Sequence, residues 1–217
     1  MPSITYAAMV DPIAAFVPGC PSLTLQYTAR KIVKDLCQRA KVWRGTYAPI
    51  NLVAGVYEYA PTTGLTYGEG CTITDGYVVI ANQKTDLFWA DYQNIRRRSP
   101  AWPQAFSGTP NAITATQPRT VLLCPVPDTA GVMTLTGTFQ PAETDTEFDL
   151  ATYSENTRCI FHGVLTELLA MPNRSWTDAK ASLLHGKQWT YLLNNARDRA
   201  ARGYNEADLA VTMRPFA

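Results

Sequence analysis

The sequence contains no Cys-x-x-Cys pair, no His-x-x-x-His spacing and only singly scattered acidic residues, so it lacks the ligand sets of known zinc sites. Its five cysteines are far apart and odd in number, which favours isolated thiols over a disulfide framework. The sequence also has no excess of charge of either sign, because 19 basic and 18 acidic residues leave a formal net charge of +1. Such a balance gives no overall field for capturing nucleic acid or an anionic membrane. We therefore predict no metal and no cofactor.

Long apolar runs are also missing, since no stretch approaches the roughly 20 residues that a membrane span needs. The apolar start of the chain has no basic leader and is interrupted by Asp11, Pro12 and Pro18, so no signal peptide is predicted. The 217 residues, 46% of them hydrophobic, suffice for a core without disulfides. We expect a soluble protein that is made in the cytoplasm and does not enter a membrane.

Residues 1–45 are predicted to contain one amphipathic helix. Pro21 and Ser22 offer a start for it, and the stretch WRGTYAP ends it. Apolar residues recur at steps of three and four between these points, which is the helical period. This predicted stripe consists of Leu25, Ala29, Ile32, Leu36, Ala40 and Trp43, widened by Val33 and Cys37.

Residues 46–150 are predicted to form β-structure. The stretches INLVAGVYEYAP, GYVVIAN, RTVLLCPVP and GVMTLTGTFQP are rich in β-branched and aromatic residues and are closed by Pro, Asn or Gly. Asp75 and Gly76 are predicted to be a turn that opens one of these strands. Between the strands, SPAWPQAFSGTPNA is predicted to be a long loop, a type that is often functional or part of an interface. An antiparallel sandwich or meander is expected.

Residues 151–203 are predicted to form a helical hairpin. One helix contains Ile160 to Leu169, and Pro172 ends it. Ser175 and Asp178 resemble a capping box that starts a second helix of roughly 40 Å. The predicted fold is thus α+β: both chain ends form a three-helix bundle, residues 46–150 are an inserted antiparallel β domain, and residues 204–217 are a tail.

The hairpin also carries His162, Glu167, Ser175, Asp178 and His185, which together suggest a small hydrolase. Capping explains Ser175 and Asp178, however, and the two histidines fall on different helices. The sequence has no G-x-S-x-G elbow to present a nucleophile. The residues therefore indicate a helical corner rather than a catalytic site, and we predict no enzyme activity.

Two further features remain open on the residues alone. The only run of positive charge is NIRRRSP, from Asn94 to Pro100, which is either a solvated loop or a contact with an acidic partner or with DNA. The tail holds apolar residues among polar ones. It is either without fixed structure or a segment that adds to a neighbouring protein.

The order of the stretches VPGCPSLTLQYTARKIVKDLCQRAKVWR, INLVAGVYEY, VLLCPVP and GVLTELLAMPNRSWTDAKAS resembles that of the head-to-tail adaptor (connector) proteins of tailed bacteriophages. The resemblance covers nearly the whole chain. Its most specific parts are the segment from Pro18 to Trp43 and the corner from Leu168 to Asp178. In architecture, the chain is similar to the tubular adaptors of short-tailed phages.

The resemblance implies a structural virion protein that forms a ring, usually a homododecamer, at the virion neck. Its partners would be further copies of itself, the portal protein, a tail or nozzle protein, and genomic DNA that passes through the channel without sequence-specific contacts. The balanced charge departs from a strongly electronegative channel, so the face that lines the lumen stays open. Alternatives are a tail-terminator or tail-completion protein and a host-surface binding module.

Candidate sites follow from this assembly role. In related connectors the C-terminal segment reaches the portal, which here implies portal contacts by residues of the tail: Leu209, Val211, Met213, Arg214 and Phe216. Aromatic residues dominate interface energetics and arginine suits acidic partners. A subunit or tail interface is accordingly predicted at Tyr92, Arg96, Arg97, Arg98, Trp102 and Phe106.

Overall fold

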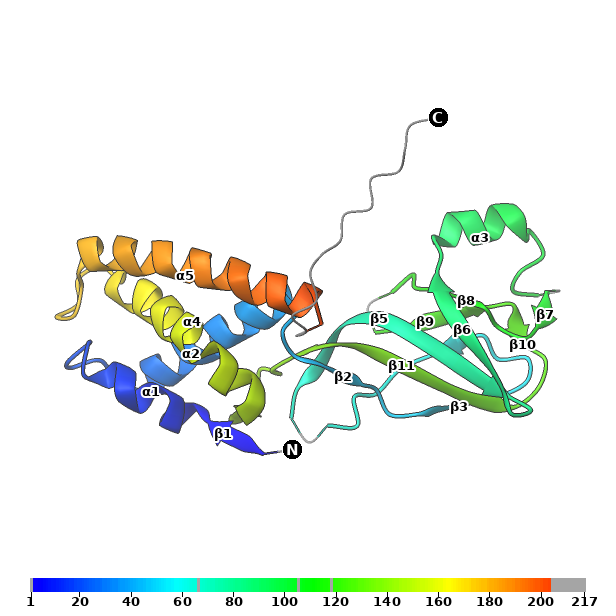
Figure 1. The fold of residues 1–217 in the computed structure, drawn as a ribbon, viewed down its shortest axis with the longest axis horizontal. Coiled ribbons are helices and arrows are strands. Elements are labelled where there is room, and N and C mark those ends of the chain that lie inside the picture. The colour runs from blue at the N-terminus through cyan, green and yellow to red at the C-terminus, as the bar shows by residue number, and fades with distance from the viewer. Residues whose placement is uncertain (1, 66, 105, 118, 204–217) are drawn as a thin grey trace. The chain divides into compact units, whose positions relative to one another are not determined.

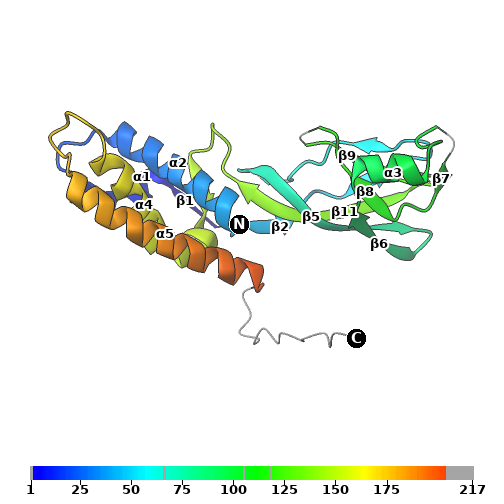
Figure 2. The ribbon, with the colours of Figure 1, turned by 90° about the horizontal axis from the view of Figure 1, so that it is seen from above.

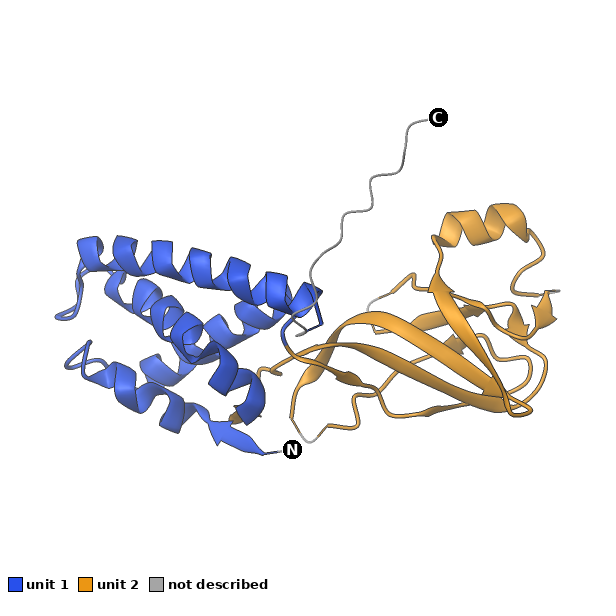
Figure 3. Cartoon of the chain, in the orientation of Figure 1, with its two compact units in different colours: residues 1–42, 149–217 blue, residues 43–148 orange. Residues whose placement is uncertain are grey.

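The computed structural model describes residues 2–65, 67–104, 106–117 and 119–203 of the chain. Two compact units divide it (Figure 3): unit 1 consists of residues 1–42 and 149–217, and unit 2 of residues 43–148. The predicted portal-contact residues, Leu209 to Phe216, lie outside the described residues. No helix within the described ranges is both long and apolar enough to cross a membrane.

Unit 1 is helical (Figure 1). It contains a short strand and four helices: β1 (Ser3–Thr5), α1 (Tyr6–Ala14), α2 (Ser22–Ala40), α4 (Leu150–Leu169) and α5 (Ala179–Ala201). Three of the helices start at a side-chain cap. Thr5 accepts a hydrogen bond from the Ala8 amide, Asp149 from the Thr152 amide and Asp178 from the Ala181 amide. Each cap satisfies an amide that the first helical turn leaves without a partner.

The core of unit 1 forms where α2, α4 and α5 meet. The members of the predicted stripe from Leu25 to Ala40 lie on α2 and are buried, which confirms that part of the prediction. Trp43 is buried too, but it lies beyond the end of α2 and belongs to unit 2. Gly163 of α4 sits at the closest approach, because a Cβ atom there would lie 2.7 Å from Ile32 of α2 and 2.7 Å from Trp189 of α5. The absence of a side chain at Gly163 is what lets these helices pack together.

Unit 2 contains a curled sheet of eight strands. Seven of them are hydrogen-bonded in the order β2-β11-β5-β6-β8-β9-β4, and the eighth, β3, also pairs with β11. Its long strands are β5 (Glu69–Ile80), β6 (Gln83–Trp89) and β11 (Gly131–Gln140). The shorter ones are β2 (Arg44–Thr46), β3 (Ile50–Leu52), β4 (Glu58–Tyr59), β8 (Ala112–Thr114) and β9 (Val121–Cys124). Outside this sheet lie α3 (Tyr92–Arg98), the pair β7 (Ser107–Gly108) and β10 (Val126–Pro127), and β12 (Glu147–Asp149).

The architecture predicted from the sequence is wrong. The described residues contain five helices, and their main sheet has eight strands of mixed direction, so they are not a three-helix bundle with an inserted antiparallel domain. Strands β6 and β8 run parallel, because the chain between them crosses over through α3. The class, α+β, agrees with the prediction. The missed helices are α1, which contains Pro12, and α3, which contains the arginine run.

The predicted turn at Asp75 and Gly76 is also wrong, since both residues lie inside β5 and pair with β11. The hairpin between β5 and β6 instead turns at Ala81 and Asn82, which have φ values of 49° and 64°. Positive φ at both central residues is the mark of the type I′ turn, whose twist matches that of paired strands.

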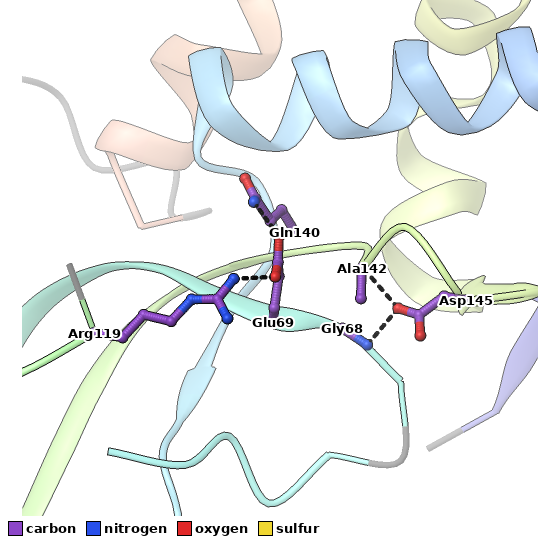
Figure 4. A network of polar contacts seen from close by, with 6 residues as sticks. All are labelled: Gly68, Glu69, Arg119, Gln140, Ala142 and Asp145. Carbon is purple, nitrogen blue, oxygen red and sulfur yellow. Dashed lines mark hydrogen bonds and ion pairs between the residues drawn. The ribbon is translucent and has the colours of Figure 1, made fainter. Parts of the chain in front are cut away.

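Polar contacts fix one end of the long strands of unit 2 (Figure 4). The Asp145 carboxylate accepts hydrogen bonds from the amides of Gly68, at 2.6 Å, and Ala142, at 2.8 Å. The Glu69 carboxylate accepts one from the Gln140 side chain at 2.6 Å and forms an ion pair with Arg119. The chain leading into β5 is thereby held against the chain leaving β11.

Candidate functional site

The polar residues of the helical corner have structural roles. Asp178 caps α5, so this helix begins at Ala179 and not at the predicted Ser175 cap. Glu167 on α4 forms a 2.7 Å ion pair with Lys31 on α2. Ser175 lies beside Gly19 in the connection before α2. These three side chains are therefore not gathered into one catalytic arrangement.

The two histidines, in contrast, are in direct contact. His162 on α4 and His185 on α5 are joined by a hydrogen bond of 2.8 Å between their Nδ1 atoms. Phe161 packs edge-on against both rings. The described residues hold no group of three or more side chains suited to a metal ion. This contact could have been found from the sequence. His162 and His185 lie at nearly equal distances along the chain from the middle of the corner between Leu168 and Asp178. In an antiparallel helical hairpin, such positions lie opposite each other.

The histidine pair is expected to make unit 1 less stable in acid. Burial lowers the pKa of His162 below its ordinary value, and the nearby positive charges of His185 and Arg158 lower it further. Because only one proton fits between the two Nδ1 atoms, a second one breaks their hydrogen bond. The unfolded chain thus binds protons more readily than the folded chain, and stability decreases as the pH falls below about 6.5.

We expect the free energy of unfolding to decrease between pH 7.5 and pH 5.5, and to decrease less in a His162→Gln variant, which has no imidazole to protonate at this position. Urea titrations of both proteins at several pH values measure this difference. An identical pH dependence in wild type and variant would contradict the assignment to His162. A Lys84→Gln variant, which changes an exposed residue of unit 2, provides the control.

The predicted interface residues of unit 2 fall into two groups. Arg96, Arg97 and Arg98 are exposed in the last turn of α3, and Phe106 is exposed as well. Together with the exposed Phe88 of β6, these residues form what we call the α3 patch. It borders a pocket of about 190 Å³ that Phe88, Arg98 and Phe106 help to line. Tyr92 is half-buried and points its ring at Trp102.

Trp102 is a core residue and not an interface anchor as predicted. It is only 1% exposed, and its Nε1 donates a 3.0 Å hydrogen bond to the carbonyl oxygen of Leu123. The rings of Tyr57 and Tyr92 pack edge-on against it, each at 5.9 Å between centroids. Sequence reasoning placed Trp102 in a long loop, but the segment folds onto the sheet and buries it.

Two exposed apolar surfaces on unit 1 escaped sequence analysis. The first, the α2 patch, consists of Leu23 and Tyr27, which are 80% and 70% exposed. The second, the α5 patch, consists of Leu183, Leu184 and Tyr191, each more than 60% exposed. Seen from above, α2 and α5 run along opposite edges of unit 1 (Figure 2).

A groove of about 810 Å³ lies between the first half of α4 and the last turns of α5. It opens at Asn156, whose φ and ψ of −117° and 15° interrupt the helical backbone of α4. The Asn156 side chain donates to the Thr152 carbonyl oxygen and accepts a 3.3 Å hydrogen bond from Arg199 of α5. The kink is stabilised because the Asn156 side chain gives the Thr152 carbonyl oxygen a hydrogen-bond donor.

The groove is lined mostly by polar and charged side chains, with Cys159 and Leu192 among them. Arg158, Arg199 and Arg202 face two acidic residues, Glu155 and Asp198, so cationic groups are in excess. Cys159 also lines it, but burial raises the pKa of this thiol to about 12, against a smaller lowering by Arg199. Cys159 is hence a protonated thiol at neutral pH and no nucleophile.

No protein-family model matches this sequence, and no curated protein matches it either. The described residues offer four surface features on which a function can rest: two apolar patches on unit 1, the α3 patch on unit 2 and the cationic groove between α4 and α5.

Proposed function

We propose that the protein is a non-enzymatic structural subunit that forms a ring, as the head-to-tail adaptors of tailed phages do. The observation that carries this proposal is the pair of exposed apolar patches of unit 1, one on α2 and the other on α5. Contiguous exposed apolar side chains on a folded protein mark an interaction surface. A ring needs two different surfaces on each subunit, one for each neighbour, and the α2 and α5 patches meet this requirement.

The energy available from these patches is sufficient for a specific contact. Burying one leucine or tyrosine side chain stabilises an association by about 1.5–3 kcal/mol. The five side chains of the two patches could therefore contribute on the order of 10 kcal/mol to each contact between neighbours, before the cost of ordering. We assign the α2 patch of one copy to the α5 patch of the next.

The charge of the chain is unevenly divided, which bears on the partners. The described residues of unit 1 include 12 basic and 7 acidic residues, whereas unit 2 has 6 basic and 9 acidic ones. Three of the six basic residues of unit 2 are the arginines of the α3 patch. That patch, apolar and basic at once, suits an acidic protein surface, and we assign it to a tail-side partner. By the family resemblance, the remaining partners are the portal protein and passing DNA, and the site of action is the virion neck.

Electron microscopy of the purified chain, alone and mixed with the portal protein of the same virus, tests the proposal. We expect closed rings, either in the chain alone or on portal particles. Monomers that persist in the presence of portal protein would contradict it. Antibody labelling of virions separates the alternatives, because a neck signal supports the adaptor and a signal at the distal tail supports an adhesion or tail-completion role.

A further inference from the structure

The pocket beside α3 has the size of one side chain. Its volume of about 190 Å³ is below the roughly 300–1,000 Å³ of sites that enclose a whole small ligand. It exceeds the cavity of about 150 Å³ that suffices to hold a benzene molecule among apolar side chains. The pocket can therefore take one large aliphatic or aromatic side chain, whereas a nucleotide or an organic cofactor is too large for it.

The lining of the pocket is apolar apart from a cationic group and a few neutral polar groups. Ile95 of α3 and Ala112 of β8 are buried lining residues, and Phe88 and Phe106 line the pocket while remaining exposed. Arg98 of α3 also lines it and is exposed. None of the described lining residues is acidic. An apolar side chain in this pocket would accordingly lie beside an uncompensated positive charge.

The charge continues beyond the pocket. Arg96 and Arg97 are exposed on the same short helix but do not line the pocket. Among the described residues, no acidic side chain forms an ion pair with any of the three arginines. Arginines near the end of a helix interact favourably with the helix dipole, but this effect does not explain an apolar pocket beside them.

These features favour a segment of another protein as the occupant. Only an occupant that extends past the pocket can reach Arg96 and Arg97, and guanidinium groups form charge-assisted hydrogen bonds with carboxylates. A nucleic acid fits less well, because the described residues of unit 2 include 9 acidic and 6 basic residues. A long polyanion would be repelled by the rest of the unit, whereas a short acidic segment needs to contact the α3 patch alone.

We infer that the α3 patch binds an acidic segment of a partner protein, which inserts one side chain of the size of leucine or phenylalanine into the pocket. Carboxylates that flank this side chain bind Arg96, Arg97 and Arg98. The inference rests on the proposed function only in its assignment of the α3 patch to a protein partner. It uses none of the contacts proposed between copies in the ring.

Fluorescence anisotropy of a labelled synthetic peptide, titrated with the full-length chain, tests the inference. The probe is a short peptide with one leucine between flanking glutamates, and its matched control has serine in place of the leucine. We expect saturable binding of the leucine peptide and at least about tenfold weaker binding of the serine peptide, because burying a leucine is worth a factor of ten or more.

Variants of the chain locate the contact. We expect Arg98→Glu and Phe88→Ala each to weaken binding of the leucine peptide at least about tenfold. The matched controls are Arg44→Glu, which makes the same charge change at another exposed arginine of unit 2, and Trp89→Ala, which removes an exposed aromatic ring next to Phe88. Neither control residue lines the pocket, so both variants should bind like wild type. Circular dichroism shows whether each variant is folded.

Four outcomes would overturn the inference. They are no saturable binding, equal binding of the leucine and serine peptides, an equal loss in Arg44→Glu and Arg98→Glu, and tighter binding of a single-stranded DNA oligonucleotide that depends on Arg98. The last would assign the α3 patch to nucleic acid. Rings without peptide binding would reject this inference alone, and peptide binding without rings would reject the ring alone.

Discussion

A Leu183→Glu, Leu184→Glu double variant is expected to remain folded and monomeric under conditions in which the wild type forms rings. Both leucines are exposed on α5, so their replacement removes nothing from the core of unit 1. In the ring, however, two buried leucines would be lost and two carboxylates would face an apolar surface. The lost burial alone is about 3–6 kcal/mol per contact, which weakens association by at least a hundredfold.

Light scattering after size exclusion measures the mass of the assembly, and circular dichroism reports whether the helices are intact. The control is a Val53→Glu, Val56→Glu variant, which places two acidic residues at exposed apolar positions of unit 2 outside the patches. It should assemble like wild type. A Leu183, Leu184 variant that still forms rings would remove the α5 patch from the interface.

Replacing Trp102 by alanine is expected to destabilise unit 2 by about 3–5 kcal/mol, the range for deleting a large buried aromatic side chain. The substitution would leave a cavity against Tyr57 and Tyr92 and deprive the Leu123 carbonyl of its hydrogen-bond donor. A loss of this size is a large fraction of the stability of an ordinary domain. We therefore expect unit 2 to unfold at a markedly lower urea concentration.

Urea denaturation followed by circular dichroism measures the effect. Trp89→Ala serves as the matched control, because Trp89 lies in the same unit but is 43% exposed. Its loss should cost less than about 1 kcal/mol. If the two variants had the same stability, Trp102 would not be the core residue described here, and its predicted role as an interface anchor would regain support.

The helical stripe of α2 was predictable because its period is local and regular. Leu25, Ile32 and Leu36 are buried as the pattern requires, and no distant contact is needed to explain them. Helix α1 escaped the same reasoning because Pro12 suggests a break. Burial of Met9, Val10 and Ile13 stabilises this helix through packing that a local pattern does not reveal.

The sheet and the surfaces depend on long-range contacts. The parallel pairing of β6 with β8 results from a crossover through α3. The arginine run in α3 predicts neither a helix nor a crossover, so the pairing could not be predicted from this stretch. Asp75 and Gly76 have the composition of a turn, but β11 pairs with both of them and keeps them in a strand. Adjacent leucines such as Leu183 and Leu184 show an apolar helix face without showing whether the chain itself covers that face.

The most direct test of the assembly account is a reconstruction by electron microscopy of the ring formed with the portal protein, at a resolution that shows side chains. We predict that Leu183, Leu184 and Tyr191 of each copy are buried against Leu23 and Tyr27 of its neighbour. A ring in which these side chains stay in solvent, with the contacts between copies made elsewhere, would contradict the account.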